Sequence, residues 1–361
     1  MDFEQTEREF YMFGRGVPRL NSIRTAIALA DEEQNLYWRF RFRFDYIEES
    51  IFSGDRYFAM IMFPELLSLY EKTPELQLNS NFSRDLLVCF RWIVEAAPEF
   101  PQISKSEIDD YFRLFKKMLI QQGKSLSIYY MKRSLFYMHV DKAIAAVDFY
   151  RFLDAPLDDV SDSKPLYYDQ QAMYYLSIGE EEKALEAAKL IFAGKLRSNA
   201  LPQATYHLFI RYYLEHEQYA HAMHYAFLAE HRVLCDPYYL DIIGTLMSLY
   251  SVTKPPQGVK IFAMHYELYQ DSKNPHMRLL FAIGAYHLFH ALNAEKHRSI
   301  LEELRIARDE PLFAQPPEQI AAHYYQEADT AAKKFDARNG TSDFQNMLNL
   351  FDKDKSLSTS E

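Results

Sequence analysis

The feature that most constrains this 361-residue chain is a pattern of large and small side chains that recurs at a nearly constant interval. The segment YYLSIGEEEKALEAAKLIF places an aromatic residue four positions before a glycine, an alanine five positions later and another alanine four after that. The residues in this order are Tyr175, Gly179, Ala184, Ala188 and Ile191. A shift of 38 residues gives Tyr213, Glu217, Ala222, Ala226 and Ala229, and a further shift of 37 gives Tyr250, Lys254, Val259, Ala263 and Tyr266. Small residues at this spacing let antiparallel helices approach closely, so we expect an array of helical hairpins.

The stretch YWRFRFRFDYIEESIF, which begins at Tyr37, alternates aromatic residues with arginine as a half-buried strand does. Helical spacing explains more of it, because one continuous apolar face contains Phe40, Phe44, Ile47 and Ile51. We therefore predict a helix. Arg39 and Arg43 would share a face that suits an anionic partner. The favoured interpretation is a solvated helix in which Arg41 pairs with Asp45 four residues later.

The repeated order of aromatic, glycine and alanine positions resembles the tetratricopeptide repeat, most closely between Tyr168 and Tyr266. The resemblance implies an all-α fold, an alpha-alpha superhelix (a TPR-like solenoid) of about seven to eight helical hairpins. In that family the first helix of each hairpin lines a concave surface. We expect an N-terminal extension over residues 1–20 and a single TPR-like solenoid over residues 21–338.

A narrower resemblance covers the middle of the chain. The segment DDVSDSKPLYYDQQAMYYLSIGEEEKALEAAKLIFAGKLRSNALP is similar to a group of bacterial TPR-like proteins that carry an SDC-x-x-C motif and a later cysteine. Here Ser163, Leu166 and Ser198 stand where those cysteines would be. We therefore expect none of the thiol or metal chemistry that such cysteines would support.

Charge and cysteine content exclude several classes of function. A formal charge of −11 disfavours binding to nucleic acid or to anionic membranes, both of which attract basic surfaces. The two cysteines, Cys89 and Cys235, form no CxxC pair, so neither a disulfide framework nor a zinc site is indicated. The acidic N-terminus MDFEQTEREF lacks the pattern of a signal peptide. We expect a cytoplasmic protein of bacterial origin.

The sequence contains no complete motif for catalysis or metal binding. His216 and His221 in HEQYAH are five residues apart, whereas the zinc motif HExxH separates its histidines by four. The pairs His221/His224 and His287/His290 lack an identifiable third ligand. No phosphate-binding loop or nucleophile elbow occurs. We expect no enzymatic activity and no cofactor.

The resemblance places five candidate partner-binding residues on the concave face, and they are Asp169, Met173, His207, Arg211 and Ser248. The expected function is that of a non-catalytic TPR-like scaffold that binds a peptide or protein partner in its concave groove. One alternative is a bacterial peptide-sensing regulatory receptor, although residues 1–36 are short for the effector domain of such a receptor. The other alternative is an enzyme whose pocket the sequence does not reveal.

The last segment, residues 339–361, is expected to form a short amphipathic helix and a disordered tail. In SDFQNMLNLF an apolar stripe falls at helical spacing, at Phe344, Met347, Leu348 and Phe351, with Ser342 or Asp343 as the N-cap. So short a helix must dock to persist. Two placements are open: the helix caps the exposed face of the final hairpin, or it occupies the groove and competes with the partner.

Overall fold

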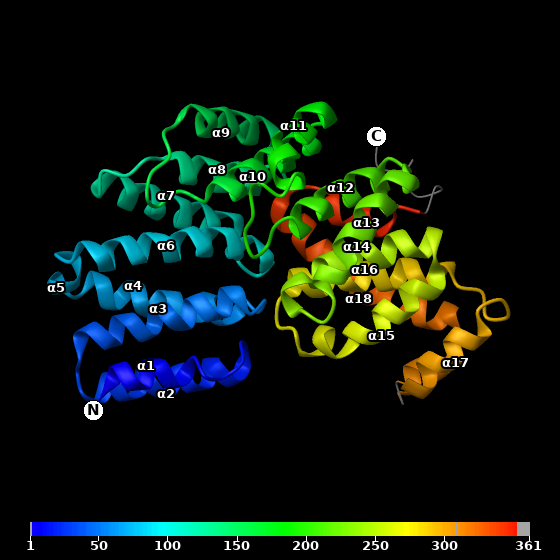
Figure 1. The fold of residues 1–361 in the computed structure, drawn as a ribbon, viewed down its shortest axis with the longest axis horizontal. Helices are drawn as coiled ribbons and strands as arrows, with labels where there is room; N and C mark the ends of the chain where they lie inside the picture. The colour runs from blue at the N-terminus through cyan, green and yellow to red at the C-terminus, as the bar shows by residue number, and fades with distance from the viewer. Residues whose placement is uncertain (1, 308–309, 352–361) are drawn as a thin grey trace. The chain divides into compact units, whose positions relative to one another are not determined.

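The computed structural model describes residues 2–307 and 310–351, and all regular elements in these residues are helices (Figure 1). The structure therefore confirms the all-α prediction for the described part of the chain. It also confirms a helix across the arginine and phenylalanine alternation, where α3 runs from Leu36 to Phe52. The expected disordered tail falls on residues 352–361, which lie outside the described residues.

The chain divides into two compact units. The N-terminal unit contains residues up to 136 together with Ala143–Ser161, and the C-terminal unit contains Tyr137–Lys142 and the residues from 162 onward. The helices α1 to α9 are Phe3–Phe10, Val17–Glu32, Leu36–Phe52, Tyr57–Glu71, Pro74–Gln77, Ser80–Ala96, Lys105–Gln121, Ser127–Tyr137 and Lys142–Asp154. The helices α10 to α19 are Lys164–Ser177, Glu181–Phe192, Gln203–Glu215, Tyr219–Val233, Leu240–Thr253, Pro255–Asp271, Pro275–Ala291, Arg298–Ala307, Pro317–Asn339 and Asp343–Leu348.

Helix α3 is an interior helix of the N-terminal unit, in contact with α2, α4 and α6. The predicted apolar stripe is buried, but Phe42 on another side of the helix is also fully buried. Burial extends to charged residues, since Arg43 is 8% exposed and Asp45 is 2% exposed. The expectation of a solvated helix is therefore wrong, because three neighbouring helices cover α3.

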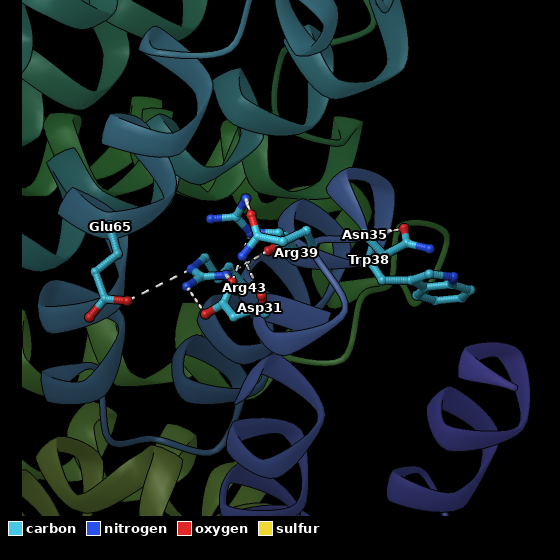
Figure 2. Close-up of polar contacts among 7 residues, drawn as sticks. Asp31, Asn35, Trp38, Arg39, Arg43 and Glu65 are labelled. Carbon is cyan, nitrogen blue, oxygen red and sulfur yellow. Dashed lines mark hydrogen bonds and ion pairs between the residues drawn. The ribbon is translucent and has the colours of Figure 1, made fainter. Parts of the chain in front are cut away.

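The charged residues of α3 are held by partners from other helices. Asp31 at the end of α2 accepts hydrogen bonds from Arg39 Nε at 2.9 Å and from both terminal nitrogens of Arg43, at 3.0 and 2.7 Å (Figure 2). The Nε atom of Arg43 lies 3.7 Å from the carboxylate of Glu65 on α4. Arg39 and Arg43 do share a face, as predicted. That face binds a carboxylate of the same unit.

Arg41 lies on a different side of α3 and pairs with Asp45, as the spacing predicted. Its terminal nitrogen is 3.1 Å from the carboxylate of Asp45, and its Nε atom donates to Glu7 on α1 at 3.1 Å. Burial is the main reason that the pKa of Asp45 is raised to about 8, although Arg41 opposes this shift. Nearby Glu7 and Glu48 raise the pKa further, since like charges disfavour ionisation.

The C-terminal unit consists of successive helical hairpins (Figure 1). The first helix of each hairpin packs on the first helix of the next, in the order α10, α12, α14, α16 and α18. The second helices α11, α13 and α15 each pack on the first helix of their own hairpin. The repeat positions have the expected places: Gly179 and Glu217 occupy turns at φ values of 76° and 56°. The small residues at the hairpin contacts are buried, and they are Ala184, Ala188, Ala222, Ala226 and Val259.

Helices α14 and α16 approach each other more closely than side chains would allow. Gly244 of α14 and Gly284 of α16 face each other at the crossing. A Cβ atom at Gly284 would collide with the carbonyl oxygen of Gly244, and one at Gly244 would collide with the carbonyl oxygen of Leu280. Two backbones therefore meet directly here.

Candidate functional site

The five predicted partner-binding residues all lie on first helices of the C-terminal unit. Asp169 and Met173 belong to α10, His207 and Arg211 to α12, and Ser248 to α14. Arg211 and Ser248 line one hollow of about 350 Å³. The other three residues are outside the lining of this hollow.

Asp169 is only 6% exposed, and its carboxylate accepts a hydrogen bond of 2.6 Å from the hydroxyl of Thr205 on α12. Met173, also on α10, is half-buried. The hydrogen bond of Asp169 joins two neighbouring first helices. This residue therefore stabilises the packing of α10 on α12 in addition to any role that it has toward a partner.

His207 likewise connects first helices. Its Nε2 atom lies 2.8 Å from the hydroxyl of Thr245 on α14, and its Nδ1 atom lies 3.7 Å from the carboxylate of Asp241. Burial, together with the nearby charge of Arg211, lowers the pKa of His207 to about 3. The imidazole is therefore neutral at physiological pH and bonds to Thr245 without carrying charge.

The hollow that contains Arg211 and Ser248 is built from three consecutive first helices and a C-terminal segment. We call the part contributed by the three helices the α12–α16 face, and it consists of Arg211, Leu214, Glu215, Gly244, Thr245, Ser248, Leu280, Ile283 and His287. Met347 and Leu350 complete the lining. Its floor is apolar, whereas Arg211 and Glu215 lie 3.7 Å apart at its rim.

His287 is a buried polar residue of the α12–α16 face that the sequence predictions did not place there. It is 3% exposed, with Nδ1 2.9 Å from the hydroxyl of Ser248 and Nε2 2.9 Å from the carbonyl oxygen of Leu348. A carbonyl oxygen only accepts, so Nε2 carries the hydrogen atom. The available signal was the repeat interval, since His287 follows Ser248 by 39 residues.

The segment over the α12–α16 face is α19 with the residues that follow it. The structure confirms a helix in this segment with Ser342 as its N-cap residue, but the side chain of Ser342 makes no capping hydrogen bond. Asp336 of α18 takes that role: its carboxylate accepts from the backbone N–H groups of Phe344 at 3.1 Å and Gln345 at 2.9 Å. The cap therefore comes from the preceding helix.

The N-terminal end of α19 is next to positive charge. The carboxylate of Asp343 lies 3.2 Å from Nδ1 of His139, which belongs to the same unit. The hydrogen bond to His139 lowers the pKa of Asp343, with further contributions from the charges of His139, Lys142 and Arg211. This end of the segment thus meets a surface that favours an anion.

The described residues contain neither a metal-binding cluster nor a membrane-spanning helix, and comparison with known proteins adds no further site. Among the described residues there is no group of three or more histidines, cysteines or acidic residues arranged to hold a metal ion. No described helix has both the length and the apolar character needed to span a bilayer. No protein family, curated protein or solved structure matches the chain.

Proposed function

We propose that the chain is a non-catalytic, TPR-like helical-repeat protein that binds a peptide or protein partner through the α12–α16 face. The observation that carries the proposal is that this face already receives a short helix. Met347 and Leu350 complete the apolar hollow, and His287 hydrogen-bonds the carbonyl oxygen of Leu348. A groove that accepts an amphipathic helix is a common mode of peptide recognition.

The chemistry of the α12–α16 face supports a peptide ligand. Its floor offers aliphatic side chains, and Arg211 at the rim offers a guanidinium to an acidic side chain. His287 offers a donor to a backbone carbonyl, a group that every peptide carries and that needs a partner when it is buried. A continuous TPR-like superhelix over residues 21–338 and a cytoplasmic setting in a bacterium are parts of the same proposal.

An enzyme is the second candidate, because Ser248 and His287 are within hydrogen-bond distance, as a nucleophile and its base must be. Two features favour binding instead. The hydroxyl of Ser248 also lies 3.2 Å from the carbonyl oxygen of Gly244, one helical turn earlier. Ser248 is in the middle of α14, where backbone N–H groups bond within the helix and are not available to stabilise an oxyanion.

The test is a selection of short random peptides displayed on their messenger RNA against the full wild-type chain. Peptides that bind are then measured against two charge reversals, Arg211→Glu on the α12–α16 face and Lys183→Glu on α11. Arg211→Glu should weaken binding by about tenfold or more, because a charge-assisted hydrogen bond is lost. Lys183→Glu should change affinity less than about twofold.

Failure to obtain any peptide whose affinity depends on Arg211 would refute the proposed binding face. A peptidase or esterase activity that disappears in Ser248→Ala would favour the enzyme. Binding that triggers association with a second protein through the N-terminal unit would favour the peptide-sensing receptor.

A further inference from the structure

The C-terminal segment is attached to α18 by a tight turn that reverses the chain. Gly340 has a φ of 73°, a conformation that suits glycine, and its N–H bonds to the carbonyl oxygen of Asp336. Helix α19 then runs for only six residues, Asp343–Leu348. A helix of that length is not stable alone in water, so its structure depends on the surface that it contacts.

The contacts of the segment are those of a bound ligand. Leu348 is fully buried, and its carbonyl oxygen bonds to His287. The ring of Phe351 packs at 4.8 Å from the imidazole of His287, and Phe344 packs at 5.0 Å from Phe335 on α18. The spacing 344, 348 and 351 is that of one face of a helix. Apolar side chains, the carbonyl oxygen of Leu348, the cap from Asp336 and the contact of Asp343 with His139 together attach the segment.

The segment also shares its surface with the predicted site. Met347 and Leu350 line the same hollow as Arg211 and Ser248. A second hollow of about 300 Å³, which His287 also lines, is lined in part by Leu348 and Phe351. A partner helix that packs on the floor of the hollow lined by Arg211 and Ser248 and bonds to His287 must occupy the position that the segment now holds. The two cannot be bound together.

We infer that residues 343–351 are an intramolecular ligand of the α12–α16 face and that the partner is an amphipathic helical peptide of the same pattern. That pattern is an acidic residue followed directly by a large apolar residue, as in Asp343 and Phe344. Further apolar residues lie four and seven positions after this apolar residue, as Leu348 and Phe351 do. The inference rests on the proposed function. It names the chemistry of the partner and makes the C-terminal segment its competitor.

The test uses the full chain and a fluorescent synthetic peptide with the sequence of residues 340–351, GTSDFQNMLNLF, followed by fluorescence anisotropy. The variant Leu348→Asp weakens the chain's own segment at its buried contact. It should bind the peptide at least about tenfold more tightly than the wild type, because the competitor is released. The control Asn346→Asp adds the same charge at an exposed position of α19 and should bind like the wild type.

A second variant, Asp343→Lys, keeps the inference testable if Leu348→Asp fails to fold. The Asp343 side chain is 44% exposed, and its replacement removes the contact with His139 while leaving every apolar contact intact. Its affinity for the peptide should rise by about two- to fivefold. A peptide that itself carries Leu348→Asp should not bind any of these chains.

The outcomes separate this inference from the proposed function. If Leu348→Asp and Asp343→Lys both have a lower melting temperature but no gain in peptide affinity, the inference is overturned and the segment is a structural cap. Should selected random peptides bind in an Arg211-dependent way while the 340–351 peptide binds no variant, the inference fails and the proposed function stands. If no peptide of either kind binds, both fail.

Discussion

The two units of this protein bury different kinds of polar side chain. In the described residues, the buried arginines and lysines, Arg43, Arg56 and Lys132, all belong to the N-terminal unit. The buried histidines, His207, His265 and His287, all belong to the C-terminal unit. The first unit therefore buries cations, whereas the second buries imidazoles, of which His207 and His265 have lowered pKa values because they are buried.

The difference affects how readily each interior can change its contacts. A buried cation needs a fixed counter-charge, and separating the pair leaves an uncompensated charge at high cost. A neutral imidazole donates with one nitrogen and accepts with the other. His265 accepts from the N–H of Cys235 at 2.8 Å, and its Nδ1 lies 2.7 Å from the carbonyl oxygen of Ile261. Neutral groups of this kind can change partners without leaving an uncompensated buried charge.

The largest expected effect concerns the backbone contact in the C-terminal unit. Gly284→Ala should lower the free energy of unfolding by about 3 kcal/mol, because the added methyl group meets the carbonyl oxygen of Gly244, which cannot move away without a shift of helix α14. The control Gly14→Ala has no atom within 4 Å of the new Cβ and should change stability by less than about 0.5 kcal/mol. Urea denaturation measures both. Equal stability of the two variants would contradict the described crossing of α14 and α16.

The next effect concerns the buried charges of the N-terminal unit. Lys132 is 4% exposed and lies 2.7 Å from Glu95, which also contacts Arg56 at 3.2 Å. Burial opposes ionisation of Glu95, but these two cations lower its pKa to about 2. Lys132→Met should therefore cost about 2 kcal/mol of unfolding free energy, since one of two counter-charges is lost.

The matched control for that variant is Lys124→Met. Lys124 pairs at 2.7 Å with Asp159, whose side chain is 53% exposed, so water replaces much of the lost interaction. A cost below about 1 kcal/mol is expected from thermal or urea denaturation. A loss as large as that of Lys132→Met would show that burial does not set the strength of these pairs.

The stability of the fold at acid pH should report the protonation of the buried His207 in the C-terminal unit. The lowered pKa of His207, about 3, means that the unfolded chain takes up a proton below pH 6.5 while the folded chain does not. Stability is therefore lost as the pH falls below 6.5. Between pH 7.5 and 5.5 this one group should cost about 1 kcal/mol. The variant His207→Gln should lose that much less over the same range, and parallel curves for wild type and variant would contradict a buried neutral His207.

The response to base concerns the buried Asp45 of the N-terminal unit, and the sign of its pH dependence is opposite to that of His207. The raised pKa of Asp45, about 8, means that the folded chain holds a proton that the unfolded chain has already released above pH 4. Stability is lost as the pH rises through 8, by about 1 kcal/mol between pH 7 and 9. In Asp45→Asn this loss should disappear. A variant that loses stability as steeply as the wild type would show that Arg41 keeps Asp45 ionised in the fold.

Much of the C-terminal unit could be predicted from the sequence because its helix contacts recur at a fixed interval. The small positions Ala184, Ala188, Ala222, Ala226 and Val259 are buried at the hairpin contacts, as the pattern required. Tyr175 and Ala263 are only half-buried, and Lys254 has a φ of −146° in place of the positive φ of Gly179 and Glu217. Arg211 and Ser248 share a hollow for the same reason. The pattern weakens after Tyr266, and only the interval of 39 residues from Ser248 pointed to His287. The contact of Gly244 with Gly284 could not be projected from the pattern.

The charged core of the N-terminal unit was out of reach for a different reason. Helical periodicity predicted the pair of Arg41 with Asp45, because both residues lie on one helix. The partners of Arg39 and Arg43 are Asp31 and Glu65, on helices before and after α3. A cap supplied by Asp336 across the turn after α18 is likewise a tertiary contact. Local sequence carries no record of which helices will meet.

Hydrogen–deuterium exchange of the full wild-type chain, followed by mass spectrometry, tests most directly whether residues 343–351 can be displaced from the α12–α16 face. Exchange is measured with and without an excess of the 340–351 peptide labelled with ¹³C and ¹⁵N. The amides of residues 343–351 should be protected without the peptide. They should lose that protection when the labelled copy takes their place, while α14 and α16 stay as protected as before. If residues 343–351 remain protected at saturating peptide, the segment is a fixed part of the core, and the account of the α12–α16 face as an exchangeable peptide-binding surface is contradicted.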